Sequence, residues 1–336
     1  MPRGELDDAI TGAAEFLSER RSRDGLWRDF HTRAGASADW VTAFTCYAAR
    51  GCDELASDVD TAVTALAERQ RPNGGWAYNH AVPTDCDSTS WALLALSIRG
   101  APDAEAVERG RGYVLAHQSA EAGGFATYSE TDGIDAFVGA PDADATADWL
   151  APHACVTSVA VQALLAHGEP ADATPVTSAR DYLLRAREEN GGWMSYWWPG
   201  QAYNTYFALR ALLAVGAIES STAGQLVEDR VKAARHRQPF GTALRLLTML
   251  LAPGDAARRA SEPAVDWLLR SQQPDGGWSS HPILRIPPPI QRDPQAHVGW
   301  STDGRRGSGV IVADPRRVFT SAAVLWALTG YRMARS

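Results

Sequence analysis

The sequence predicts an all-α protein, an (α/α)6 toroidal barrel in which six inner helices are ringed by six outer ones. Two observations predict this fold: a short turn motif recurs along the chain, and six strongly apolar segments alternate with one-faced amphipathic ones. Such a period indicates repeated helical pairs, because each pair buries its apolar surface only against its neighbours. One closed ring of this kind uses the whole chain, residues 1–336.

The repeated turn ends in an aromatic residue that follows one or two glycines. Its copies are RSRDGLW (21–27), QRPNGGW (70–76), QSAEAGGF (118–125), REENGGW (187–193) and QQPDGGW (272–278). The first three aromatic residues are equally spaced, the longer fourth step fits an insertion, and the fifth fits a skipped, degenerate copy near RHRQPFG (235–241). Gly allows a tight left-handed exit from the outer helix, and the indole is predicted to pack over its neighbour.

The six apolar segments are predicted to be the inner helices, because they are apolar on nearly every face. Each opens with a Thr: Thr42, Thr89, Thr157, Thr205, Thr242 and Thr320. A Gly follows most of them where a C-cap is expected, namely Gly51, Gly100, Gly168, Gly216 and Gly254.

The outer helices are amphipathic. In residues 57–70 the apolar positions follow the i, i+3, i+4, i+7 rule (Val59, Ala62, Val63 and Leu66). Ser57 and Asp60 form a predicted capping box at the start of this helix. No segment shows the alternation of a strand.

Composition limits the classes of function. Apolar residues make up 45% and charged residues 21% of the chain, and the net charge is −8. This balance offers neither the basic stripe of a nucleic-acid binder nor a polybasic membrane anchor. No run approaches the ~20 apolar residues that span a bilayer, so any membrane contact is expected to be peripheral. The N-terminal MPRGELDDAI has no hydrophobic h-region, and the cysteines form no CxxC pair, so a cytoplasmic location is predicted.

The turn motif resembles a known repeat. QxxxGxW turns between paired helices are similar to the QW repeats of squalene-hopene cyclases and other class II terpene cyclases. The resemblance covers essentially the whole chain, about one β-type barrel, and rests on two intact copies (70–76 and 272–278) and three variants. It implies the fold, which several functions share.

The second inner helix opens with two carboxylates, in PTDCDSTSWALLAL (83–96). Protonating an alkene or epoxide takes a carboxylic acid that stays neutral until it is used, and crowding and burial raise a carboxyl pKa in that sense. The segment resembles the family's Asp-x-Asp-Asp-Thr motif with Ser in place of the last Asp, and more closely the Asp-x-Asp-Thr-Thr variant of drimane-type cyclases. The resemblance implies that Asp87 donates the proton and Asp85 tunes it, while Ser88 and Thr89 hold its lone pairs. Asp-Ser-Thr before an apolar helix is also a good N-cap.

His153 begins the third inner helix, at the rim where Asp87 is expected. From there it would hydrogen-bond the acid and re-protonate it. In hopene cyclases the supporting His lies just after the Thr of that helix, where this sequence has Ser158 and Val159. The alternative is a rim residue without a catalytic role.

Aromatic residues gather at the N-termini of the inner helices. A carbocation cascade needs a dry apolar cavity whose π-faces stabilise positive charge, and an ordinary aromatic core is the alternative. The candidates for substrate binding are Trp40, Trp91, Tyr203, Tyr206, Phe207, Phe240 and Phe319, in a chain with 12 Trp that include Trp197 and Trp198.

Two long segments join a turn to an inner helix, and we call residues 126–152 the first rim loop and residues 279–317 the second rim loop. Topology places both on the face of Asp85 and Asp87, where they are predicted to act as a lid; solvated loops are the alternative. Arginines of the second loop would hold a diphosphate (Arg285, Arg292, Arg305, Arg306, Arg316 and Arg317). With such a substrate, acidic residues of the first loop would hold Mg²⁺ (Asp132, Asp135, Asp142, Asp144 and Asp148); otherwise no cofactor is expected.

The resemblance therefore predicts a protonation-initiated cyclase of a linear isoprenoid or a prenylated small molecule. One alternative is a protein similar to a zinc-dependent prenyltransferase β-subunit, in which His153 and Cys155 would join Asp85 as ligands. A second is a non-catalytic ring that binds a hydrophobic ligand or a partner protein, and a third is a cyclase that acts on a non-terpenoid alkene.

Overall fold

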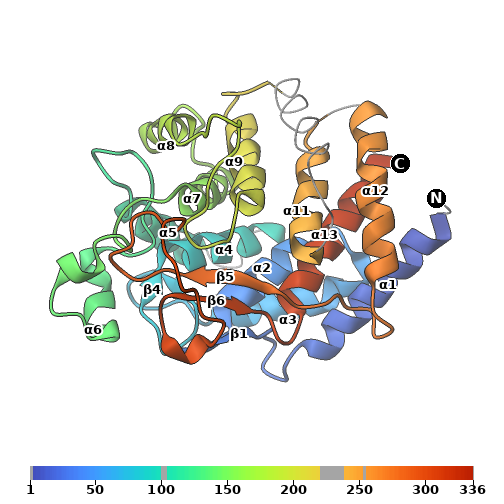
Figure 1. Ribbon diagram of the computed structural model, residues 1–336, viewed down its shortest axis with the longest axis horizontal. Helices are drawn as coiled ribbons and strands as arrows, with labels where there is room; N and C mark the ends of the chain where they lie inside the picture. The colour runs from blue at the N-terminus through green and yellow to red at the C-terminus, as the bar shows by residue number, and fades with distance from the viewer. Residues whose placement is uncertain (1–2, 100–103, 220–237, 253–254, 336) are drawn as a thin grey trace.

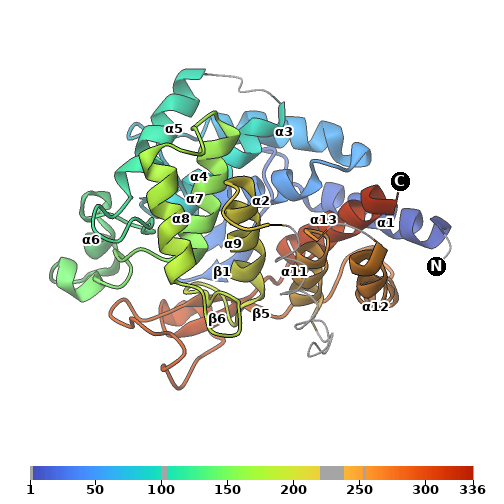
Figure 2. The ribbon, with the colours of Figure 1, turned by 90° about the horizontal axis from the view of Figure 1, so that it is seen from above.

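The computed structural model describes residues 3–99, 104–219, 238–252 and 255–335, and their helices form two concentric rings (Figures 1 and 2). Each inner helix packs against the next, and the last packs against the first, which closes the ring. The inner helices are α2 (Asp39–Ala49), α4 (Cys86–Leu96), α7 (Ala154–Ala166), α9 (Ala202–Ala214), α11 (Pro239–Met249) and α13 (Val318–Arg335). The predicted (α/α) barrel is confirmed.

The outer helices cover this ring. They are α1 (Arg3–Arg20), α3 (Ala56–Ala67), α5 (Ala104–Ala116), α8 (Thr174–Arg185) and α12 (Asp255–Ser271). Residues 220–237, between α9 and α11, lie outside the described residues, as does part of the degenerate turn copy expected at 235–241. The apolar positions predicted for α3 are all buried. The predicted capping box is wrong, since α3 begins at Ala56 and its N-cap residue Leu55 makes no side-chain hydrogen bond.

The glycines of the repeated turn have the predicted left-handed backbone. The five φ values lie between 79° and 89°, at Gly25, Gly74, Gly123, Gly191 and Gly276. A Cβ on Gly74 would also lie 2.6 Å from the carbonyl oxygen of Arg109 on the next outer helix, and one on Gly75 would lie 3.0 Å from the ring of Tyr113. Both glycines are therefore needed for the turn to fit against that helix.

The turn and the Thr at the start of each inner helix form one hydrogen-bonded unit. Trp76 donates its indole N–H to Leu66 at the end of the preceding outer helix (2.7 Å) and its backbone N–H to Thr89 Oγ1 (2.9 Å). Gln70 donates to the carbonyl oxygen of Ala106 on the next outer helix (2.7 Å). The hydroxyl groups of Thr42, Thr157 and Thr205 likewise accept the backbone N–H of the aromatic residue in their own turns. In the last turn the backbone N–H of Trp278 donates to the hydroxyl of Ser321, the residue after Thr320.

The glycines predicted to cap the inner helices behave differently from one another. Gly168 and Gly216 follow α7 and α9 with φ of 84° and 66°, as expected for a left-handed cap. Gly51, after α2, does not have a positive φ. Gly100 and Gly254 lie outside the described residues.

Among the described residues, three short antiparallel strand pairs occur at the N-terminal ends of inner helices, where no strand was predicted. They are β1 (Asp29–Thr32) with β2 (Gly35–Ser37), β3 (Trp76–Ala77) with β4 (Thr84–Asp85), and β5 (Pro282–Ile286) with β6 (Val310–Ala313). Such short strands do not repeat often enough to show an alternating pattern. In β3–β4 the Trp76↔Asp85 register places the first residue of the acid motif beside the turn.

The two rim loops carry most of the remaining structure. The first contains η3 (Glu130–Asp132), α6 (Ile134–Val138) and η4 (Ala143–Thr146), and the second contains β5, β6 and η5 (Gly304–Arg306). Trp149 donates its indole N–H to the carbonyl oxygen of Pro287 (3.2 Å), which joins the loops. Elsewhere, η1 (Asp53–Leu55) precedes α3 and η2 (Ser97–Arg99) follows α4. No helix in the described part of the chain is long and apolar enough to cross a bilayer.

Candidate active site

Asp85 is the N-cap residue of α4, whereas Asp87, the Asp of the Asp-Ser-Thr sequence for which capping was the alternative, lies inside the helix. Asp85 Oδ1 accepts the backbone N–H of Ser88 (2.7 Å) and Asp85 Oδ2 accepts the Ser88 hydroxyl (2.6 Å). The Thr89 hydroxyl donates to the Asp85 carbonyl oxygen (2.7 Å). Burial raises the pKa of Asp85 to about 7, although the hydrogen bonds from Ser88 lower it.

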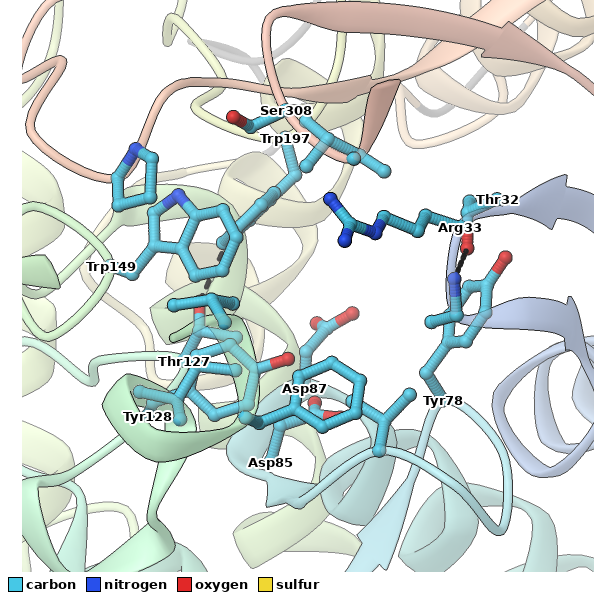
Figure 3. Close-up of a pocket in the computed structure, with 18 of the residues that line it drawn as sticks. Thr32, Arg33, Tyr78, Asp85, Asp87, Thr127, Tyr128, Trp149, Trp197 and Ser308 are labelled. Atoms are coloured by element: carbon cyan, nitrogen blue, oxygen red, sulfur yellow. Dashed lines mark hydrogen bonds between the residues drawn. The ribbon is translucent and has the colours of Figure 1, made fainter. Parts of the chain in front are cut away.

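Asp87 lies in the first turn of α4, and its carboxyl group points into a cavity (Figure 3). The indole N–H of Trp40 donates to Asp87 Oδ2 (3.1 Å). Burial raises the pKa of Asp87 well above its usual value, the charge of Asp85 raises it further, and the Trp40 hydrogen bond opposes both. A carboxyl group with these properties is neutral over a wide pH range and available to a bound molecule.

The cavity has a volume of about 660 Å³, within the range of small-molecule pockets. It is bounded by the β1–β2 hairpin, the start of α4 and both rim loops. Figure 3 shows Asp87 between Tyr128 and Tyr78, with Trp149, Trp197 and Arg33 across the cavity from it. The aromatic lining residues are Trp40, Tyr78, Tyr128, Phe137, Trp149, Trp197 and Trp198.

Of the seven aromatic residues predicted to bind substrate, Trp40 lines the cavity, and the other six are not among its lining residues. Phe319 stacks on Trp40 (ring centroids 5.0 Å apart), and Tyr203 stacks on Trp198 (4.3 Å). These rings form a layer directly behind the wall. The other four predicted residues also belong to this second layer. Their ring contacts are Phe240 with Trp198, Phe207 with Tyr203, Trp91 with Phe207, and Tyr206 with Phe207.

His153 is the N-cap residue of α7, and the structure gives it partners other than Asp87. Its ring stacks on Tyr196 at 3.7 Å, and Nε2 lies 2.8 Å from the carbonyl oxygen of Asp148, an acceptor. Burial lowers the pKa of His153 to about 4. A neutral imidazole that donates to a backbone carbonyl fixes the end of the first rim loop, and its re-protonating role stays a prediction.

The predicted diphosphate ligands are spread apart. Arg285 is buried and donates through Nε to the carbonyl oxygen of Tyr196 (2.8 Å), so it holds the segment before α9. Arg292 is exposed, and its charge acts on Asp148. Arg305 pairs with Asp303 (2.9 Å). Neither Arg316 nor Arg317 is among the lining residues, whereas Arg306 is.

The predicted metal ligands also have other surroundings. Asp132 is bound to His117, and Asp85 accepts the hydroxyl of Ser88. Within residues 3–99, 104–219, 238–252 and 255–335, no three His, Cys, Asp or Glu side chains converge as metal ligands would.

Several lining residues were missed by sequence reasoning, among them Arg33, Tyr78, Tyr128 and Trp149. Tyr78 and Tyr128 share a signal that could have found them: each closely follows the aromatic residue of a repeated turn, as Trp197 does. That stretch always runs along the N-terminal rim of the inner ring, where the cavity lies.

Fold and site together define a helical ring with a buried acid at the mouth of an aromatic cavity, and known proteins share the ring fold. The Squalene-hopene cyclase C-terminal domain family matches residues 77–239. The type II terpene cyclase MstE from Scytonema superposes with a TM-score of 0.89 and 28% identity, over 98% of this chain and 99% of MstE. A variant of MstE is known in complex with geranylgeranyl dihydroxybenzoate, its substrate, and matches with a TM-score of 0.87 over 98% of both chains at 28% identity.

A curated relative is the drimenyl diphosphate synthase of Streptantibioticus cattleyicolor, which is 30% identical over 68% of this chain. The match covers 43% of the length of that synthase. Matches to a squalene-hopene cyclase and to a second drimenyl diphosphate synthase likewise cover less than half of those proteins. These similarities in sequence and fold support a class II terpene cyclase-like family for this chain.

Proposed function

We propose that this protein is a class II cyclase that acts on a linear isoprenoid or a prenylated small molecule and starts ring closure by proton transfer from Asp87. The observation that carries the proposal is the environment of Asp87. Its carboxyl group faces an aromatic cavity, accepts one hydrogen bond from Trp40, and has a pKa raised by burial and by Asp85. Side-chain proton transfer of this kind needs no bound cofactor.

The first step moves one proton. The O–H bond of Asp87 breaks as a C–H bond forms at the terminal alkene, or an O–H bond at an epoxide, and the electron pair of the next alkene closes the ring. The positive charge then travels along the chain, and the π-faces of Trp40, Tyr78 and Trp198 stabilise it. The cascade ends when the last carbocation loses a proton, or when water captures it and the resulting protonated alcohol loses a proton; either loss balances the proton that Asp87 supplied.

The remaining residues of the motif position the acid. Ser88 occupies both oxygens of Asp85, which leaves Asp85 as a fixed neighbour of Asp87 and not a second donor. Thr89 ties this turn of helix to Asp85 and to the backbone N–H of Trp76. Asp85, Ser88 and Thr89 are thus proposed to act through Asp87.

The far side of the cavity suits an anionic head group. Arg33 reaches into the cavity opposite Trp149 (Figure 3), and its guanidinium has no carboxylate partner in the described part of the chain. Arg306 and Ser308 lie on the same rim. Guanidinium groups bind carboxylates and phosphates bidentately. The substrate named for MstE is a dihydroxybenzoate, and the curated synthases are named for a diphosphate; both are acidic groups.

The test is incubation with a panel of farnesyl diphosphate, geranylgeranyl diphosphate, geranylgeranyl dihydroxybenzoate, squalene and its epoxide. Mass spectrometry should find a cyclised product with at least one of them. Arg33→Ala should raise KM about tenfold for an anionic panel member, because the loss of one charge-assisted hydrogen bond weakens binding by roughly that factor. Any turnover of squalene, which has no anionic group, should stay unchanged. Arg305→Ala is the matched control, because Arg305 pairs with Asp303 and does not line the cavity. Absence of product from every panel member would contradict the proposed function.

A further inference from the structure

A buried cluster of three side chains lies behind the acid motif, outside the cavity. It consists of Tyr113 on α5, His117 just after α5, and Asp132 in η3 of the first rim loop. His117 Nε2 lies 2.7 Å from Asp132 Oδ2, and the Tyr113 hydroxyl donates to Asp132 Oδ1 (2.7 Å). The side chains of His117 and Asp132 are 2% and 3% exposed.

The hydrogen bonds define the charges of this cluster. His117 Nδ1 faces the carbonyl oxygen of Tyr113 (2.8 Å), which only accepts, so this nitrogen carries a proton. Asp132 also receives the backbone N–H of Ser129 (2.6 Å), so its oxygens are surrounded by donors. This geometry is that of an imidazolium paired with a carboxylate, in which every polar group has a partner. Burial raises the pKa of Asp132, but the hydrogen bond and charge of His117 bring it below its usual value.

The ion pair fixes one end of a short segment whose other end lies on the acid helix. Thr127 accepts the backbone N–H of Cys86, the first residue of α4 (2.8 Å), and its hydroxyl accepts the indole N–H of Trp197 (2.8 Å). Tyr128, between Thr127 and Asp132, forms the cavity wall beside Asp87. Residues 127–132 therefore span from the start of α4 to the ion pair.

We propose that the His117–Asp132 ion pair is a positioning element of the acid site, which holds residues 127–132, and with them Tyr128 and the start of α4, in place around Asp87. The inference rests on the proposed function of Asp87. His117 and Asp132 touch no reacting atom, and they act through Tyr128 and Thr127.

The charges of His117 and Asp132 also influence the pKa of Asp85 in the acid motif. The charge of Asp132 raises the pKa of Asp85, and that of His117 lowers it. The titratable groups that face Asp85 come from three elements: Cys86 and Asp87 on α4, Asp132 and Tyr128 in the first rim loop, and His117 and Tyr113 from α5. Removing the charge of Asp132 should therefore let the acid pair lose its first proton at a lower pH.

The test compares Asp132→Asn and His117→Gln with Glu169→Gln. Glu169 is the matched control, because it pairs with Arg111 of the same helix α5 and is also partly buried. On the panel substrate that the wild type converts fastest, Asp132→Asn and His117→Gln should lower kcat about 100-fold, as expected for a displaced reacting group, with little change in KM. In Asp132→Asn the alkaline limb of the kcat profile should move to lower pH. Hydrogen–deuterium exchange of residues 126–132, measured without substrate, should be faster in both variants. Glu169→Gln should match the wild type in all three measurements.

The outcomes separate this inference from the proposed function. A wild type that converts no panel substrate refutes the proposed function, and exchange at residues 126–132 still decides whether the pair holds the segment. Wild-type kcat and pH profile in Asp132→Asn, even with faster exchange, would show a merely structural pair and overturn the inference. If Asp132→Asn does not fold, Tyr113→Phe removes a single hydrogen bond to Asp132 and should change kcat and exchange in the same direction, by less.

Discussion

In the described part of the chain, two pairs of buried carboxylates lie at the N-termini of inner helices, and they differ in what surrounds their oxygens. Asp85 and Asp87 lie at the start of α4, whereas Asp29 of β1 and Asp314 bind the start of α13. Burial raises the pKa of Asp314 to about 7, as it does for Asp85, and the charge of Asp29 adds to it. By burial and crowding alone the two pairs would be hard to tell apart.

The carboxylate oxygens of Asp29 and Asp314, the pair at α13, are occupied by hydrogen bonds from the protein. Asp29 accepts the backbone N–H groups of Arg316 (3.0 Å) and Val318 (2.8 Å), and Asp314 accepts the N–H of Thr320 (2.8 Å) and the hydroxyl of Ser280 (2.8 Å). Neither lines the cavity. Asp87 instead has one donor and faces open space. A raised carboxyl pKa therefore indicates an acid catalyst only where an oxygen is left free toward a cavity.

The largest expected difference between the pairs is catalytic. Asp87→Asn keeps the shape of the side chain and the contact with Trp40 but removes the proton donor, so turnover should fall about 1,000-fold or more, the range of general acid catalysis. Product formation by mass spectrometry measures it, with circular dichroism to verify the fold. Asp314→Asn is the matched control and should retain wild-type kcat in the folded fraction. Wild-type turnover by Asp87→Asn would mean that another group supplies the proton.

The second difference concerns stability. Asp29→Ala would leave buried N–H groups at the start of α13 without acceptors, and each such group costs roughly 1–3 kcal/mol. We expect a loss of about 3 kcal/mol in the free energy of unfolding, measured by urea denaturation. Asp87→Asn should show no such loss, because Asp87 accepts no backbone N–H. Equal stability of Asp29→Ala and the wild type would mean that the α13 pair is not a structural cap.

The repeated parts of the molecule could be predicted from the sequence, because each repeat solves the same packing problem. The turn glycines, the indoles and the Thr residues recur at fixed places, and the structure joins them by the same hydrogen bonds in copy after copy. Asp85 and Asp87 were singled out by the resemblance of residues 83–96 to the family's acid motif, and their place at the start of an inner helix set them on the rim.

The rim loops could not be predicted in the same way, because they lack a repeat. Arg285 was expected to bind a diphosphate, but the β5–β6 pairing buries it against the segment before α9. Asp132 was expected to hold a metal ion, but its partner His117 belongs to another element and forms no local motif with it. These placements depend on contacts between elements, which periodicity does not report.

The smallest expected effect is the pH dependence of stability that the acid pair imposes. In the unfolded chain Asp87 ionises near pH 4, whereas in the folded protein its pKa is raised well above that. A group with a raised folded pKa contributes stability below its unfolded pKa and loses it as pH rises. The wild type should therefore lose stability between pH 4 and pH 8 relative to Asp87→Asn, which does not titrate there. Urea denaturation at both pH values measures this, and Asp181→Asn, a change at an exposed ion pair, should follow the wild type. If the wild type and Asp87→Asn stay parallel from pH 4 to pH 8, the Asp87 carboxyl is ionised in the folded protein and is no better a proton donor than a surface aspartate.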